Sequence, residues 1–287
     1  MAYRRITAIE AAEMINDGDM MALSGFTPNG NPKAIFRELS KRAVRLHDAG
    51  QPFQVGILTG ASSCQSVEGD MAAAHALKFR APFSTNKDFR THTNLGEVDY
   101  EDMHLGHMAE RLRRGFYGEV DWAIIEVSDL DEGATECRAY LTTAGGIVST
   151  IARLAKKVII EHNQFHNPNS RFLHDTWEPH ECWENREVMD IHSPYDRVGN
   201  NYVSIDLLAN DMKHGRIPKS FLPIQSGVGA TGNAVLKALG TSPLIPQFNV
   251  YSEVVQDAAV NYMLEGKIKY ASATAMTVTN ECLQQVY

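Results

Sequence analysis

Short, largely apolar runs alternate along the chain with segments that have helical periodicity. Runs of strand length occur at residues 20–23, 54–58, 122–125, 157–160, 202–205, 221–224 and 248–251. Helical segments follow or separate them, and the clearest lie at residues 32–39, 147–154, 207–214 and 232–239. Strands that alternate with helices are typical of an α/β fold. We therefore predict open α/β sheets, in which ligands bind at the carboxyl ends of the strands.

A glycine-rich turn follows the run at residues 221–224. It reads Gln-Ser-Gly-Val-Gly at residues 225–229, and its glycines allow backbone N–H groups to approach a ligand closely. Gly232 and Asn233 are expected to open the next helix, and N–H groups at a helix start bind anions and stabilise oxyanions. The turn is therefore a candidate site for an anionic ligand or a negatively charged intermediate.

Glu253 follows the run at residues 248–251, which should deliver it to the same end of the sheet as the glycine-rich turn. A carboxylate that faces N–H groups is a candidate nucleophile beside its own oxyanion hole. The alternative is an ordinary glutamate at a strand end or a helix start, a position that the helix dipole favours. Asp257 is the rival carboxylate, and we interpret it as a residue at the N-terminus of a helix.

The pattern Ser-Gly-x-x-x-x-Gly-Asn occurs twice, at residues 24–31 and 226–233. Each copy follows an apolar run and precedes a helical segment. This repeat favours two related α/β domains, each with its own strand, turn and helix. Gly25 and Gly30 could therefore face a ligand, although a purely structural turn is the alternative for this first copy.

Residues 225–229 followed by Tyr-Ser-Glu-Val-Val-Gln-Asp at residues 251–257 resemble the acetyl-CoA hydrolase/transferase family of class I CoA-transferases. Further familial segments lie at residues 114–121, 158–163 and 215–219. The resemblance extends from about residue 20 to about residue 278, and it depends on the order of these segments more than on any one of them.

The resemblance implies a CoA-transferase that moves CoA from an acyl-CoA thioester to a small carboxylate such as acetate, through a glutamyl-CoA thioester. Glu253 is the implied nucleophile, since a glutamate is ionised at neutral pH. The expected residues for the oxyanion and substrate are Gln225, Val228 and Gly229, and those for CoA are Ser226, Gly227, Gly25 and Gly30. CoA is a substrate here, and no cofactor is expected. The alternatives are an acyl-CoA (acetyl-CoA) hydrolase and a CoA-binding domain without activity of its own.

The implied fold has two related open α/β domains of the CoA-transferase type. We place the N-terminal domain at residues 1–206 and the start of the second, incomplete in this chain, at residues 207–287. Two departures from the family pattern bear on this division. The family has additional residues where Asp206 here runs directly into Leu207. Family chains also continue well beyond the equivalent of Tyr287, which would leave an unfinished sheet edge and a tendency to associate, for example as a homodimer.

Composition narrows the classes of function. The chain has 287 residues and a net charge of −8, which argues against a nucleic acid or an anionic membrane surface as the main partner. No apolar stretch approaches the ~18 residues of a membrane span, and no secretory signal is visible. The four cysteines are scattered without CxxC spacing, so we expect neither a disulfide framework nor a zinc site. These features together predict a cytoplasmic protein.

Histidines provide the best case for a metal. His162 and His166 have the i, i+4 spacing of zinc ligands on a helix, and further candidates follow at His174, His180, Cys182 and His192. Asn-Pro-Asn at residues 167–169 instead indicates a loop, in which that spacing loses its meaning. We therefore predict that the protein binds no metal.

Overall fold

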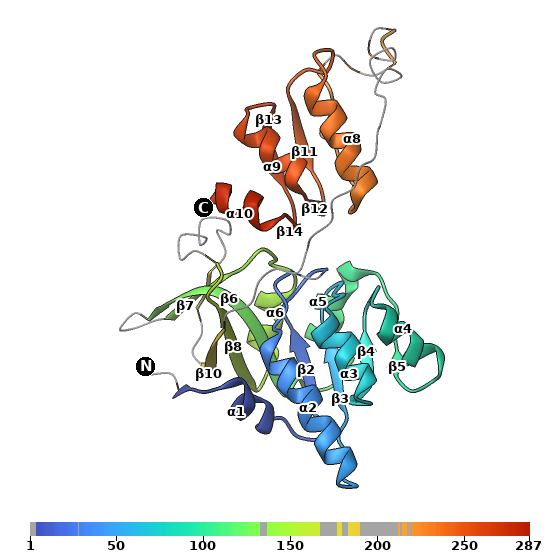
Figure 1. Cartoon of the computed structure of the whole chain (residues 1–287), viewed down its shortest axis with the longest axis vertical. Coiled ribbons are helices and arrows are strands. Elements are labelled where there is room, and N and C mark those ends of the chain that lie inside the picture. The colour runs from blue at the N-terminus through green and yellow to red at the C-terminus, as the bar shows by residue number, and fades with distance from the viewer. Residues whose placement is uncertain are drawn as a thin grey trace. The chain divides into compact units, whose positions relative to one another are not determined.

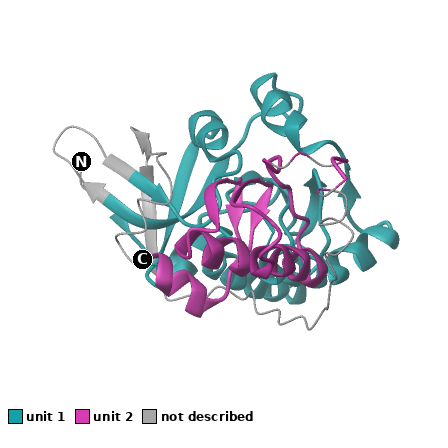
Figure 2. Ribbon diagram, turned by 90° about the horizontal axis from the view of Figure 1, so that it is seen from above, with its two compact units in different colours: residues 1–192 teal, residues 193–287 magenta. Residues whose placement is uncertain are grey.

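The structure is a computed structural model that describes residues 4–27, 29–132, 137–166, 177–179, 183–189, 212, 214–216, 218 and 220–287. It divides into two compact units, residues 1–192 and 193–287 (Figures 1 and 2). The boundary predicted at residues 206 and 207 lies outside the described residues, as does the strand predicted at residues 202–205.

Unit 1 contains a large sheet in which ten of the described strands take part. Eight follow one another across it in the order β1-β10-β8-β6-β2-β3-β4-β5, and every neighbouring pair in this path is parallel. Their bounds are β1 (Arg4–Arg5), β10 (Trp183–Met189), β8 (Lys157–Asn163), β6 (Trp122–Glu132), β2 (Met20–Leu23), β3 (Val55–Leu58), β4 (Leu77–Ala81) and β5 (Asp99–Tyr100). Strand β7 (Cys137–Leu141) pairs antiparallel with β6 and with β9 (Trp177–Pro179).

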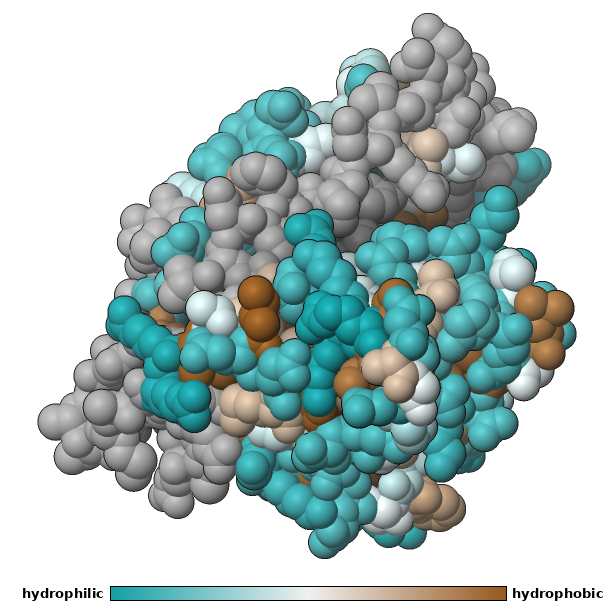
Figure 3. Space-filling view, turned by 60° about the horizontal axis from the view of Figure 1, so that its bottom comes forward, coloured by the Kyte–Doolittle hydropathy of each residue, from teal (hydrophilic) through white to brown (hydrophobic). Residues whose placement is uncertain are grey.

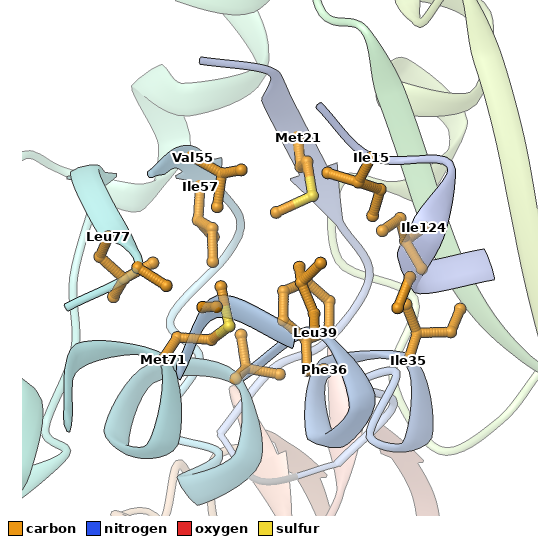
Figure 4. Close-up of a cluster of buried hydrophobic side chains, with 14 of the residues drawn as sticks. Ile15, Met21, Ile35, Phe36, Leu39, Val55, Ile57, Met71, Leu77 and Ile124 are labelled. Atoms are coloured by element: carbon orange, nitrogen blue, oxygen red, sulfur yellow. The ribbon is translucent and has the colours of Figure 1, made fainter. Parts of the chain in front are cut away.

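Helices cover both faces of this sheet. On one face pack α1 (Ala8–Glu13), α2 (Ala34–Asp48) and the π-helix Gln65–Gly69 with its continuation α3 (Asp70–Ala73). On the other face pack α5 (Leu105–Arg113) and α6 (Val148–Leu154). Figure 4 shows the first core, in which Met21, Ile57 and Ile124 of the strands meet Phe36 and Leu39 of α2. Helix α4 (Lys87–Asn94) contributes Phe89 to the same core.

The strands are continuous apolar runs because both faces of the sheet are buried. Met21 and Leu23 point into the first core, and Ala22 between them points into the second. The strands predicted at residues 20–23, 54–58, 122–125 and 157–160 are confirmed, the last two as the beginnings of longer strands. The predicted α/β class is also confirmed.

Unit 2 is smaller and has two short parallel strand pairs. Strand β11 (Phe248–Tyr251) pairs with β13 (Ile268–Ser272), and β12 (Val254–Val255) pairs with β14 (Ala275–Met276). Helices α8 (Ala230–Thr241) and α9 (Asp257–Leu264) pack on the first pair, and α10 (Asn280–Val286) follows. The core of the unit joins Leu236 and Leu239 of α8 to Phe248 and Val250 of β11.

Two local predictions in unit 2 are wrong. Residues 221–224 do not form a strand, because only Ile224 makes a bridge, to Val250. Phe221 has a φ of 49°, outside the β region, and Pro223 has no N–H to donate to a strand ladder. Helix α8 begins at Ala230, before Gly232, with Gly229 as its N-cap.

The face drawn in Figure 3 is mostly hydrophilic, with hydrophobic residues in small scattered groups. Among the described helices, none combines the length and the apolar character that crossing a membrane requires.

Candidate active site

The glycine-rich turn starts from a fixed point beside β11. The backbone N–H of Ile224 donates to Asn249 O at 2.9 Å, and the N–H of Tyr251 donates to Ile224 O at 3.0 Å. This parallel bridge places Gln225 beside the end of β11, where Glu253 follows. The prediction that the turn and the glutamate share one end of the sheet is therefore confirmed within unit 2.

Glu253 lies between β11 and β12 and is exposed. Its backbone carbonyl accepts hydrogen bonds from Thr274 N at 3.0 Å and Ala275 N at 3.2 Å, which fix the main chain. Its carboxylate has no hydrogen-bond or ion-pair partner among the described residues. The side chain is thus held at its base and open to a ligand at its tip.

An open hollow of about 410 Å³ surrounds this carboxylate. Its lining consists of Gln225, Tyr251, Ser252, Glu253, Ser272, Ala273 and Thr274. A smaller hollow of about 190 Å³ lies against the same turn and is lined in part by Val235, Leu236 and Leu239 of α8. Gln225 lines both hollows. Glu253 lines the larger hollow, whereas the smaller hollow has a more apolar wall.

Ser252, directly before Glu253, holds the first part of the turn. Its hydroxyl accepts a hydrogen bond from Ser226 N at 3.3 Å and donates one to Ser226 O at 2.9 Å. Ser252 is buried, so water does not compete freely for these contacts.

Gln256, three residues after Glu253, holds the second part of the turn. Its Oε1 accepts a hydrogen bond from Gly229 N at 3.1 Å, and its Nε2 donates to Gly227 O at 3.2 Å. Its side chain is buried, with 6% of the residue exposed. The segment that carries the candidate nucleophile therefore also fixes the turn, through both Ser252 and Gln256.

Gly229 adopts a backbone conformation that only glycine takes readily, with φ 124° and ψ 175°. Its N–H is already engaged by Gln256. Val228 is half-exposed, and its N–H has no acceptor among the described residues. Of the two N–H groups predicted to stabilise an oxyanion, that of Val228 is the available one in this arrangement.

Asp257 occupies a structural position, as its interpretation as a helix-start residue predicts. It is the first residue of α9, and its carboxylate accepts hydrogen bonds from Thr279 N at 3.1 Å and Thr279 Oγ1 at 2.6 Å. Thr279 is in turn the N-cap of α10. Asp257 therefore links the starts of two helices, and it is absent from the lining of the hollow around Glu253.

The first copy of the repeated pattern lies in unit 1, at the carboxyl end of β2. Ser24 Oγ donates to Gly30 O at 2.6 Å and accepts from Glu126 N at 2.8 Å. Gly25 has a φ of 123°, and a Cβ there would collide with the side chain of Asn31. These contacts explain the presence of Gly25 and Gly30 by the local structure of the turn. Their contact with CoA stays a prediction.

A buried charged cluster lies behind this first turn. Lys33 Nζ pairs with Glu126 Oε2 at 3.0 Å, and Thr142 Oγ1 donates to Glu126 Oε1 at 3.1 Å. Glu161 accepts hydrogen bonds from the backbone N–H groups at the start of α2, those of Lys33 at 2.5 Å and of Ala34 and Ile35 at 3.2 Å. Burial, together with repulsion by Glu126, raises the pKa of Glu161 to about 7.

The sequence shows Glu126 and Glu161 only as strand-end acids. Glu126 follows the apolar run at residues 122–125, and in the structure it makes the buried contact with Lys33. Nothing in the local sequence indicates that Glu161 caps α2, because the two are 126 to 128 residues apart.

The two histidines with i, i+4 spacing do not lie on a helix, in agreement with the interpretation that this spacing has no meaning here. His162 lies in β8, where its Nε2 contacts Ser128 O at 3.0 Å, and His166 is buried beyond that strand. His174, His180, Cys182 and His192 lie outside the described residues.

A different group could hold a divalent cation at the surface of unit 1. One ligand atom from each of His75, His92 and Glu97 lies within 4.8 Å of the others. His92 Nδ1 and Glu97 Oε2 already share a contact of 2.6 Å, which accounts for the arrangement without a metal. No spacing in the sequence indicates this group, because its members come from a turn, a helix and a loop.

Comparison with known proteins shows the family to which the chain belongs. Residues 1–205 match the profile of the acetyl-CoA hydrolase/transferase N-terminal domain. The chain is 38% identical to a propanoyl-CoA:succinate CoA transferase of Escherichia coli K12, covering 99% of this chain and 64% of that protein. It is 31% identical to a succinyl-CoA:acetate CoA-transferase of Clostridium kluyveri, covering 98% of this chain and 57% of that protein.

The chain therefore spans about two thirds or less of the length of these relatives. The alignment with the E. coli protein runs over 320 residues, more than the 287 of this chain, so that relative carries residues that this chain lacks. Among solved structures, RipA from Yersinia pestis superimposes with a TM-score of 0.75 at 16% identity, covering 99% of this chain and 66% of RipA. That likeness concerns the fold.

Proposed function

Because the chain belongs to the acetyl-CoA hydrolase/transferase family, we propose that it provides the nucleophile of a CoA-transferase, which moves CoA from an acyl-CoA to a small carboxylate such as acetate. The observation that carries this proposal is the exposed carboxylate of Glu253 beside the glycine-rich turn, which has no hydrogen-bond or ion-pair partner among the described residues. The enzymes named for the E. coli and Clostridium relatives exchange CoA between carboxylic acids, which agrees with this reading.

The reaction proceeds by two exchanges at Glu253. Its carboxylate attacks the thioester carbonyl, the C–S bond breaks, and an acyl-glutamyl anhydride forms as CoA leaves as a thiolate. The thiolate then attacks the glutamyl carbonyl, which gives an enzyme-CoA thioester and releases the acyl group as a free carboxylate. A second carboxylate acid runs these steps backwards and leaves as the new acyl-CoA. The chemistry consumes no metal or redox cofactor, and CoA takes part as a substrate.

Each step passes through a tetrahedral intermediate with a negative oxygen. The N–H of Val228 is the donor that we assign to this oxygen, since the N–H of Gly229 is engaged by Gln256. One such donor typically lowers the activation barrier by about 3 kcal/mol. Gln225 lines the hollow, and we propose that it contacts the substrate. A role for Ser226, Gly227, Gly25 and Gly30 in binding CoA remains part of the proposal.

The alternative function is acyl-CoA hydrolysis, which the family description also covers. In that case water takes the place of the second carboxylate at the enzyme-bound intermediate. Assaying the products with and without acetate separates the two: a transferase needs acetate to form acetyl-CoA, whereas a hydrolase releases CoA without it. A CoA-binding domain without activity would show neither product.

The decisive experiment uses the catalytically complete protein. On incubation with acyl-CoA, mass spectrometry of the digested protein should locate a covalent CoA adduct on Glu253. The adduct should be missing from Glu253→Ala, and an adduct that persists in this variant would remove Glu253 from the proposed role.

The wider expectations are proposals of the same kind. We expect the protein to act in the cytoplasm on acyl-CoA and small carboxylates, and to form a homodimer. Native mass spectrometry would measure the oligomeric state, and cell fractionation would measure the location.

A further inference from the structure

The side chain of Gln256 occupies an unusual place relative to the candidate nucleophile. We propose that Gln256 is a positioning residue, which clamps the glycine-rich turn so that the Val228 N–H can serve the intermediate formed at Glu253. This inference deepens the proposed function and rests on it for its catalytic consequence. Its structural consequence can be measured separately.

The clamp is a two-point contact made by one amide group. Oε1 accepts from Gly229 N at 3.1 Å and Nε2 donates to Gly227 O at 3.2 Å, so the side chain pairs with the backbone on both sides of Val228. A backbone strand would pair with an extended segment in a similar way. The pairing fixes the peptide group between residues 227 and 228, which carries the available N–H, and the next peptide group, between residues 228 and 229.

The turn needs such a clamp because its own sequence does not determine its conformation. Glycine residues at 227 and 229 have access to more backbone conformations than any other residue. Gly229 is the N-cap of α8 and has no side chain that could cap the start of the helix. The side chain of Gln256 is buried. Loss of its amide would leave Gly227 O and Gly229 N without these hydrogen-bond partners.

The clamp also sets the position of the turn relative to Glu253. Ser252 and Gln256 lie one residue before and three residues after the glutamate, and they bond to Ser226 and to Gly227 and Gly229, respectively. The acid and its turn are thus linked by buried side chains on either side of the acid. Displacing a catalytic group by about 1 Å can cost on the order of 100-fold in rate.

Two variants test this in the catalytically complete protein. Gln256→Met keeps the length of the side chain and removes both hydrogen-bonding atoms. Gln247→Met is the matched control, since Gln247 belongs to the same unit and also donates to a turn carbonyl, that of Gly266, away from Glu253. We expect kcat for Gln256→Met to fall roughly 10- to 100-fold with KM for acyl-CoA changed by no more than about 3-fold.

A third variant separates positioning from general stability. In Gln256→Glu, the protonated carboxyl can donate to Gly227 O and accept from Gly229 N, as the amide does. Once ionised, it has no proton to donate and repels Gly227 O. Glu253 and Asp257 are the acids beside it in the chain, and the turn and first residues of α8 carry no charge. The ratio of its kcat to that of the wild type should therefore rise as pH falls.

The outcomes are distinct. If Gln256→Met keeps the kcat of Gln247→Met while the wild type forms the adduct, the positioning role is overturned and the proposed function stands. If the wild type forms no adduct, the proposed function fails, and hydrogen exchange of the Gly229 N–H by NMR tests the clamp alone. That exchange should be faster in Gln256→Met than in Gln247→Met, and equal rates in both would overturn the clamp.

Discussion

The backbone N–H of Lys33 donates to the carboxylate of Glu161 at 2.5 Å, although the two residues are 128 positions apart. Lys33 precedes α2, and Glu161 lies in β8, so a strand side chain caps a helix that has no side-chain cap of its own. The helix start favours a carboxylate there, but complete burial and the nearby Glu126 oppose its ionisation. The burial effect is the larger, and it raises the pKa of Glu161 to about 7.

This raised pKa predicts how stability depends on pH. The unfolded chain loses the Glu161 proton near its ordinary pKa of 4.5, and the folded chain keeps it until about 7. The stabilisation by the protonated form is therefore fully present below pH 4.5 and is lost as pH rises through 7. The loss should be on the order of 3 kcal/mol.

Glu161→Gln tests the assignment by urea unfolding at several pH values. The variant should be less stable at low pH, because its amide cannot accept all three N–H groups. It should lack the fall in free energy of unfolding that the wild type shows between pH 4.5 and 7. An equal fall in both proteins would show that another group titrates.

Removal of the Lys33 charge should destabilise unit 1. Lys33 and Glu126 are both buried, so Lys33→Met leaves a carboxylate without its counter-charge. Breaking a buried pair in this way typically costs 3–5 kcal/mol, so we expect a loss of about 3 kcal/mol by chemical denaturation. The double variant Lys33→Met/Glu126→Gln should recover part of that loss, and a double variant no better than the single one would contradict the account.

Gly229 should tolerate alanine much less well than its neighbour Gly227. A Cβ at either position meets nothing within 4 Å, so steric clashes do not separate them. Gly229 differs because of its φ of 124°. Gly229→Ala should therefore cost about 1–3 kcal/mol of stability and lower kcat, since the start of α8 must rearrange. Gly227→Ala is the matched control for thermal unfolding and activity, and equal effects of the two would exclude backbone conformation as the cause.

Local patterns in the sequence were sufficient to predict most of the strands and helices named above. They also predicted that Glu253 lies beside the glycine-rich turn. Apolar runs such as residues 20–23 and 248–251 form strands. They could be predicted because the hydrophobic pattern of a strand is contained in a few consecutive residues. The run at residues 221–224 failed for a local reason as well, since Pro223 lacks an N–H and Phe221 has a positive φ. Only the bridge at Ile224 remains, and it is enough to place Gln225 beside β11.

Contacts between distant segments were beyond the reach of those patterns. Gln256 was visible only as part of a familial motif, and its clamp on Gly227 and Gly229 depends on how β12 packs against the turn. Glu161 was visible only as the end of an apolar strand. Both side chains contact residues that are distant in the sequence. The packing of the folded chain determines these contacts, and no sequence spacing predicts them.

Asp257 provides the sharpest contrast with Glu253, because both acids lie in one segment of the same unit. Asp257 accepts hydrogen bonds from the N–H and hydroxyl of Thr279, at 3.1 and 2.6 Å, and so joins the starts of α9 and α10. Asp257→Asn should weaken these contacts and lower stability by about 1 kcal/mol, as the loss of a helix-terminal contact does. Thr279→Val should have a similar effect by removing the other partner.

The two acids should therefore separate in a paired measurement of stability and adduct formation. Asp257→Asn should unfold at a lower temperature than the wild type and still form the CoA adduct on Glu253. Glu253→Gln should unfold near the wild-type temperature, because its exposed carboxylate has no partner among the described residues, and should form no adduct. Loss of the adduct in Asp257→Asn, under conditions where the variant is folded, would mean that Asp257 takes part in the chemistry.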